Sequence, residues 1–255
     1  MMKFLIFFLI IIINCKLALS RNSGETEITT DDGIEVFQDE KYYLLKKNVE
    51  IFSDELELKG QIVKIYFEND LYDIQKLIAN DQVSFISEQY NISGNGDNLE
   101  FNIKDQNILL YGNKSELYLE NTEMLSDGEI NLDNLKGTFY IKGPNSILIS
   151  ENIYITGSKI SGSFDEIDNK RDISNLVVED NNKLNIKTDD IVMFSKKAIY
   201  DKKKSVIELF EEVEINRGNE IITGEYGVLD TKKNSYKVSS GDSTKVKAII
   251  LGSNE

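Results

Sequence analysis

Short runs in which apolar and polar residues alternate with period two fill this chain from Ile28 to Ile250. The runs are rich in Ile, Val, Leu, Tyr and Phe, and clusters of Asn, Asp, Gly, Ser or Lys separate them as turn signals. Because side chains along a strand point alternately to opposite faces, each run has one apolar and one polar face. The pattern predicts an all-β fold of successive antiparallel hairpins. We expect almost no helix, and the segment 70–79 is the best candidate for one.

One ladder of this kind occurs twice, as NVEIFSDELELKG at 48–60 and EVEINRGNEIITG at 212–224. An offset of 164 residues superposes several apolar positions and a glycine, and the segment 28–32 also matches 186–190 through a shared Thr-Asp-Asp. Matched blocks in the same order indicate a duplicated β unit. We expect one elongated domain over 21–255, with repeat units at about 28–113 and 186–247 and a further β segment at 114–185 between them.

The first twenty residues have the layout of a secretory signal peptide, with Lys3, an apolar run from Phe4 to Ile13, and Ala18-Leu19-Ser20 at the cleavage site. The run of ten residues is half of the roughly 20 that a membrane-spanning helix needs. We therefore expect cleavage after Ser20 and export. Retention of the segment as a membrane anchor is the alternative.

Charge and composition exclude several classes of function. The leader carries two positive charges, Lys3 and Lys16, so its removal lowers the net charge from −15 to −17. Such a polyanion is repelled by nucleic acid and by anionic membrane surfaces. Histidine is absent, which excludes a Ser/His/Asp triad and a histidine-containing zinc site. We expect no enzyme, no cofactor, no metal site and no nucleic-acid partner.

Two acidic pairs and one pair of glycines carry weaker signals. We interpret Asp189-Asp190 and Glu211-Glu212 as solvated strand ends rather than paired catalytic carboxylates. Gly157 and Gly162 have the spacing of a phosphate loop, but the lysine that should follow is missing. The segment 157–162 is therefore predicted to be a hairpin turn.

The order of residues between 186 and 247 resembles a known family. Asp190 comes first, then Tyr200-Asp201 before a Lys-rich turn, a strand pair from Ile207 to Ile215, and Ile222-Thr223-Gly224. This order is similar to that of the LptA/OstA-like family of periplasmic lipopolysaccharide transport proteins. Residues 28–113 match it more loosely, and 114–165 match only in general pattern.

Two features depart from the family pattern. The usual Gly-Asn-Val is Lys47-Asn48-Val49 in the first copy and Glu211-Glu212-Val213 in the second. The middle segment also makes this chain longer than a compact family member. These departures leave the turn chemistry of both copies open.

The resemblance implies a V-shaped antiparallel β-jellyroll that holds lipid A chains in an apolar groove. It implies a periplasmic protein that binds lipopolysaccharide and helps to bridge the inner and outer membranes. LptC-like and LptD-like components would be its partners, and edge strands would permit head-to-tail self-association. Two alternatives stay open: an LptC-like, membrane-tethered component of the same pathway, and a structural or adhesive exported β-repeat protein with no lipid ligand.

The period-two pattern also names candidate residues for the groove. Inward-facing positions of the two ladders either contact lipid or seal the core, because the same alternation serves both roles. Glu208 and Glu214 should face water. The groove candidates are Val49, Ile51, Leu58, Ile207, Leu209, Val213, Ile215 and Ile222.

Overall fold

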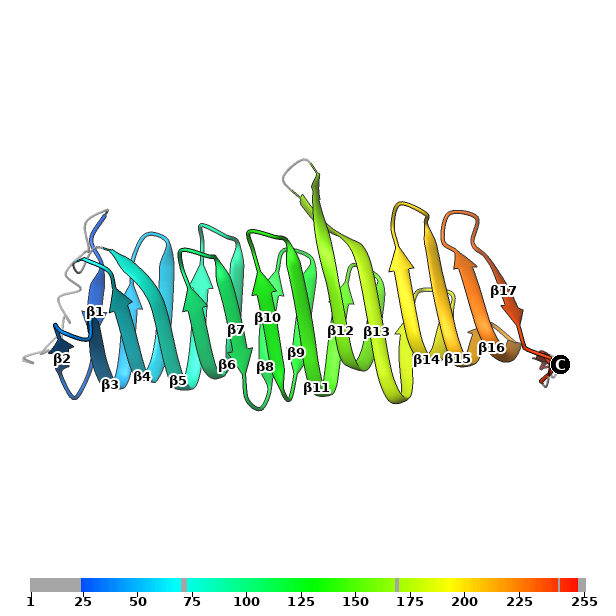
Figure 1. The fold of residues 1–255 in the computed structure, drawn as a ribbon, viewed down its shortest axis with the longest axis horizontal. Helices are drawn as coiled ribbons and strands as arrows, with labels where there is room; N and C mark the ends of the chain where they lie inside the picture. Colours follow the sequence, from blue (N-terminus) through cyan, green and yellow to red (C-terminus); the bar gives the residue numbers. More distant parts are fainter. Residues whose placement is uncertain (1–23, 70–72, 168–169, 243, 252–255) are drawn as a thin grey trace, which may run out of the picture.

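The computed structural model describes residues 24–251 except 70–72, 168–169 and 243, so the predicted signal peptide lies outside the described residues. All described regular structure is β-strand, arranged as an elongated stack (Figure 1). The strands are β1 (Glu27–Thr29), β2 (Ile34–Phe37), β3 (Tyr42–Phe52), β4 (Leu56–Phe67), β5 (Ile74–Ser87), β6 (Ile92–Asn102), β7 (Asn107–Tyr111), β8 (Ser115–Leu119), β9 (Thr122–Ser126), β10 (Glu129–Asp133), β11 (Thr138–Ser150), β12 (Ile153–Ile167), β13 (Lys170–Lys187), β14 (Val192–Asp201), β15 (Val206–Arg217), β16 (Glu220–Asp230), β17 (Ser235–Ser239) and β18 (Lys247–Ile250).

The strands form one antiparallel sheet that is folded lengthwise into two leaves. Ten long strands, β3 to β6 and β11 to β16, contribute one half to each leaf, and the pairing register shifts at the middle of each pair where the sheet bends. We call leaf A the half that contains β2, β7, β10 and β17, and leaf B the half that contains β1, β8, β9 and β18. In the described part of the chain each leaf contains fourteen strand segments, which at ~4.8 Å between neighbours gives a length of about 60 Å.

Pairs of left-handed residues make the bend in three of the long strands. Lys47-Asn48, Asp81-Gln82 and Glu211-Glu212 all have φ between 48° and 63°. They are exposed, and each pair lies between two buried apolar residues four positions apart, as Leu45 and Val49 do. A left-handed residue costs about 1–2 kcal/mol. The two packed leaves hold this strain because straightening the strand would expose one of its apolar halves.

Buried serines satisfy backbone carbonyls that the bends remove from the ladder. Ser195 Oγ donates to the carbonyl of Lys197 at 2.9 Å, and Ser146 Oγ donates to the carbonyl of Gly143 at 2.8 Å. Both serines are fully buried. An unsatisfied buried carbonyl would cost about 1–3 kcal/mol, so these hydroxyls let the sheet fold sharply.

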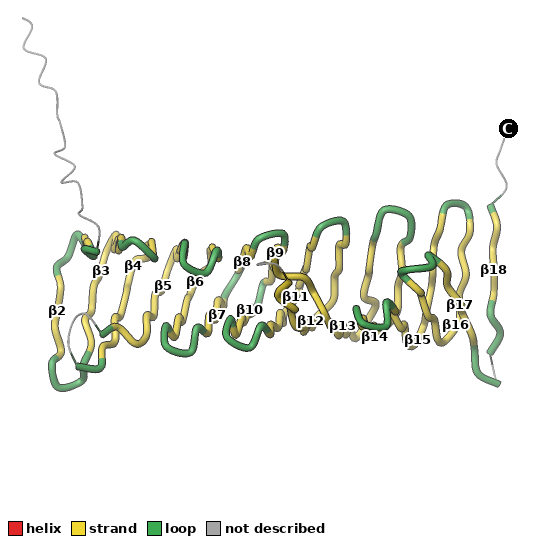
Figure 2. The backbone as a smooth tube through the Cα atoms, turned by 90° about the horizontal axis from the view of Figure 1, so that it is seen from above, coloured by secondary structure: helices red, strands yellow, loops and turns green. Residues whose placement is uncertain are grey.

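The hairpin turns lie on the side of the molecule opposite the bends. Seen from above, they form two rows along opposite sides of the stack (Figure 2). We call these rows the rims, one for each leaf. The rims face each other because the leaves are joined along the bends, and the space between them is the mouth.

The inward faces of both leaves form one apolar core, so the expectation of an all-β antiparallel sheet folded over an apolar interior is confirmed. The expectation of little helix is also confirmed for the described residues, since the segment 70–79 belongs to β5 from Ile74 onward. In the second ladder β15 ends at Arg217 and β16 begins at Glu220, and Gly218 has φ 57° in the turn between them.

Two local predictions are wrong, and both fail for the same reason. Glu211-Glu212 is the bend inside β15 rather than a strand end, so Ile207 and Ile215 belong to one folded strand. The segment 157–162 lies inside β12 at its bend rather than in a hairpin turn. Polar residues and glycines normally indicate a turn between two strands. In this protein they mark a bend within one continuous strand.

The two matched blocks of the sequence repeat behave differently. Leu45 and Leu209 both precede a left-handed pair, and Gly60 and Gly224 are the strand partners of Val49 and Val213. The shared Thr-Asp-Asp does not superpose. In the first copy it lies at the bend line, where the Asp31 N–H donates to the Lys47 carbonyl, whereas 188–190 form a turn on the rim of leaf B. The duplicated unit stays a prediction.

Candidate functional site

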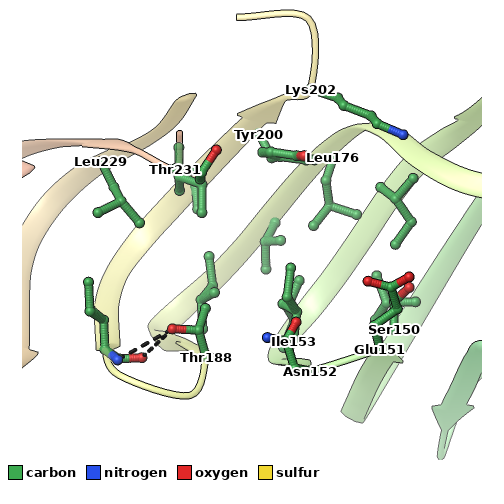
Figure 3. Close-up of a pocket in the computed structure, with 18 of the residues that line it drawn as sticks. Ser150, Glu151, Asn152, Ile153, Leu176, Thr188, Tyr200, Lys202, Leu229 and Thr231 are labelled. Atoms are coloured by element: carbon green, nitrogen blue, oxygen red, sulfur yellow. Dashed lines mark hydrogen bonds between the residues drawn. The ribbon is translucent and has the colours of Figure 1, made fainter. Parts of the chain in front are cut away.

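The candidate site is an apolar cleft in the mouth, between the leaves formed by β11 to β16. Its volume is about 480 Å³, within the roughly 300–1,000 Å³ of small-molecule sites. Figure 3 shows Leu176, Tyr200 and Leu229 of leaf A on one side and Ile153 of leaf B on the other. Val178 and Ala198, both almost fully buried, belong to the deeper part of its lining.

Side-chain size explains why the mouth is open here and closed elsewhere. Toward β3 to β6, aromatic rings fill the row nearest the turns: Tyr43 packs on Phe67 with 5.2 Å between ring centroids, and Tyr90 packs edge-on against Phe101 at 6.3 Å. Over β14, one inward position of the cleft lining carries a small group, Ala198. This small side chain leaves unfilled volume between the leaves.

A long hairpin bounds the cleft on the side facing β11. At their joined ends β12 and β13 rise beyond the neighbouring turns in Figure 1, and we call residues 164–167 and 170–173 the crossing hairpin. Phe164 packs on Phe139 with 4.9 Å between ring centroids, and the backbone N–H of Arg171 donates to Glu120 Oε2 at 3.1 Å. Because Glu120 belongs to the rim of leaf B, this contact spans the mouth. It separates the cleft from the part of the mouth over β3 to β6, which we call the aromatic half.

Charged side chains surround the entrance of the cleft unevenly. On leaf B, Glu151, Asp189 and Asp190 line it and are exposed, and Asn152 Nδ2 donates to Asp189 Oδ2 at 2.7 Å. On leaf A the charges are Asp172 and Lys202, whose Nζ donates to Asp172 Oδ2 at 2.9 Å. Among the described residues that line the cleft, the leaf A charges therefore cancel and the leaf B charges do not.

The titratable groups of leaf A are held in fixed states. Burial raises the pKa of the Tyr200 phenol, so this group stays neutral at physiological pH. The hydrogen bond to Asp172 raises the pKa of Lys202, so the lysine stays charged. These groups supply polarity at the entrance without titrating near neutral pH.

The groove candidates named from the sequence lie mainly in the core. Ile207 also lines the cleft, whereas Ile222 is only partly buried and lies between Ile215 of β15 and Ala248 of β18, near the end of the stack. Their contact with lipid stays a prediction. All groove candidates except Ile222 are at most 5% exposed: Val49, Ile51, Leu58, Ile207, Leu209, Val213 and Ile215. Glu208 and Glu214 point away from the core, where they bond to Tyr226 and Lys183.

Of the groove candidates named from the sequence, Ile207 lines the cleft. Ile173, Ala198 and Leu229 also line it, and none of them was a groove candidate. The available signal is the small side chain of Ala198 at an inward position, but Ala79 is equally small and buried in the closed half. That signal has meaning only once the facing leaf is known.

No helix in the described part of the chain is long and apolar enough to cross a membrane.

Comparisons with known proteins leave the family open. No family model matches the sequence, and no curated protein matches it. Among solved structures, one similar chain is LptH of Pseudomonas aeruginosa, described as the LptA-homologous periplasmic component of the lipopolysaccharide transport device. The match covers 89% of this chain and 96% of that chain, with 7% sequence identity and a TM-score of 0.23. A likeness at that level assigns this chain neither a family nor a function.

Proposed function

We propose that this chain is an exported lipid carrier whose cleft holds acyl chains of lipopolysaccharide out of water between the inner and outer membranes. The observation that carries the proposal is the apolar cleft of about 480 Å³ that opens between the rims of β11 to β16. Each methylene moved from water into such a space contributes about 0.8 kcal/mol. Chain burial alone therefore supplies the binding free energy, without catalytic side chains.

The ends of the stack support the transport role. In the described part of the chain, β1 and β2 pair with β3 alone, and β17 and β18 pair with β16 alone. Apolar side chains are exposed at both ends: Val36 is 46% exposed in β2, and Ile250 is 77% exposed in β18. Open edges of this kind accept another strand. They would join this chain to a second copy or to LptC-like and LptD-like components of a periplasmic bridge.

Lipid carried by the purified protein tests the proposal. Native mass spectrometry of protein isolated from the periplasm should detect lipopolysaccharide on the wild type. Ile173→Asp places a charge in the cleft at a partly buried position and should remove the lipid, whereas Ile199→Asp, on the outward face of β14, should retain it. Lipid absent from folded wild-type protein would instead support an exported structural β-repeat.

A further inference from the structure

The two rims at the entrance of the cleft differ in charge. Glu151, Asp189 and Asp190 sit together on the rim of leaf B, beside the apolar lining. The facing pair Asp172 and Lys202 is neutral as a unit, with 2.9 Å between Nζ and Oδ2. A ligand whose chain enters the cleft would place its polar group near these three carboxylates, and the nearby cation Arg217 is directed to the Asn234 carbonyl, at 3.3 Å.

We propose that the cleft selects an amphiphile whose headgroup presents an ammonium group to the rim of leaf B. This inference rests on the proposed function, that the cleft binds acyl chains. An anionic group at the same place would face repulsion from Glu151, Asp189 and Asp190. The hydrogen bond from Asn152 fixes the carboxylate of Asp189 at the rim, so the negative charge keeps its position.

Lysines in the turns of leaf A do not cancel this preference. Lys204 and Lys233 fold back onto Asp201 and Asp230, at 3.1 and 3.2 Å. Lys203 and Lys232 are exposed in the same turns but do not line the cleft. Lys203 and Lys232 would contact an anionic group farther out on the same headgroup. The ammonium group would therefore still lie at the rim of leaf B.

Three amphiphiles with the same twelve-carbon chain separate headgroup charge from chain burial: dodecylammonium, dodecyl maltoside and laurate, titrated below their micelle concentrations. At an ionic strength of ~0.01 M, where the Debye length is about 30 Å, dodecylammonium should bind on the order of tenfold tighter than dodecyl maltoside, and laurate weaker than both. The difference should shrink at ~1 M salt, where the Debye length is about 3 Å. The buffer contains a chelator, and a second series adds Mg²⁺.

Matched variants locate the effect at the rim. The triple variant Glu151→Gln, Asp189→Asn and Asp190→Asn should bind dodecylammonium and dodecyl maltoside equally. A control with the same change in net charge at exposed distant sites, Glu57→Gln, Glu88→Gln and Glu211→Gln, should keep the preference.

The possible outcomes separate this inference from the proposed function. Binding of dodecyl maltoside without tighter binding of dodecylammonium would overturn the headgroup inference and leave the lipid-carrier proposal standing. Preferential binding of laurate, with or without Mg²⁺, would also overturn the inference. If none of the three amphiphiles bound to folded wild-type protein, the lipid-carrier proposal itself would fail.

Discussion

Enlarging one small side chain should close the cleft without unfolding the protein. Ala198 is 2% exposed and belongs to the lining at the level of Val178. In Ala198→Phe, the added ring would enter the space that the proposed acyl chain occupies. It would reproduce the aromatic filling that Tyr43 and Phe67 already provide in the other half of the mouth.

The size of the effect follows from the displaced volume. A benzyl group replaces about four methylenes of a bound chain, which at ~0.8 kcal/mol each removes about 3 kcal/mol of binding free energy. The dissociation constant should then rise on the order of 200-fold. The ring itself contributes up to about 2 kcal/mol on burial, offset by strain where it meets its neighbours, so the free energy of unfolding should change little.

Titration of dodecyl maltoside, followed by calorimetry, measures the dissociation constant, and urea unfolding measures stability. Ile199→Phe is the matched control, because Ile199 is the next residue of β14, on the outward face, and does not line the cleft. It should bind like the wild type. An Ala198→Phe protein that folds and binds with unchanged affinity would refute the reasoning that this cleft takes the chain.

Three further predictions concern the folded sheet. Ile215→Asp places a carboxylate at a position that is 1% exposed and should lower the free energy of unfolding by more than about 3 kcal/mol in urea melts, whereas Glu214→Lys, on the outward face, should cost only about 1 kcal/mol through the lost ion pair with Lys183; equal losses of stability would mean that the two side chains do not face as described. At the bend, Glu211→Gly should stabilise by up to about 1 kcal/mol, because glycine removes left-handed strain, and Glu211→Val should destabilise; the opposite order would contradict the bend. The pH dependence follows from Glu214, whose pKa is lowered from 4.5 chiefly by the hydrogen bond from Lys183, so its stabilisation is present above that pH and is lost as the pH falls through the lowered pKa. Glu214→Gln should therefore be less stable than the wild type at pH 7, and the deficit should shrink as the pH falls below 4.5; a deficit that stays unchanged in acid would argue against the ion pair.

The alternation of residues predicted the facing of side chains correctly because it is a local property of strands. Val213, Ile215 and Leu58 are buried as expected, while Glu214 points outward to Lys183. Period-two patterning needs no knowledge of the partner strand, since the backbone alone sends neighbouring side chains to opposite faces.

The bends could not be recognised from residue type. Lys47-Asn48 and Glu211-Glu212 contain no glycine, yet both pairs are left-handed because the packing of two leaves compensates the strain. The apparent turn at 157–162 is likewise a bend, where a side chain on Gly157 would come within 2.8 Å of Val178 Cγ1. A hairpin turn and a bend within a strand both need residues that adopt unusual backbone angles. Local composition therefore does not distinguish a turn from a bend.

The cleft depends on pairs of positions that are distant in sequence. Two features decide which part of the mouth is filled. One is the size of a side chain such as Ala198 relative to the leaf that faces it, and the other is the hydrogen bond from the crossing hairpin to Glu120. Neither follows from periodicity. The sequence therefore predicts an apolar interior, and the three-dimensional arrangement decides which part of it is open.

Crosslinking shows directly whether one half of the mouth is sealed while the other half holds an acyl chain. Photo-crosslinking residues are placed singly at Tyr43 and Phe101 in the aromatic half and at Ile173 and Leu229 in the cleft, in the presence of lipopolysaccharide. We expect lipid adducts at Ile173 and Leu229 and none at Tyr43 and Phe101. Adducts spread evenly along both halves, or confined to the aromatic half, would contradict it.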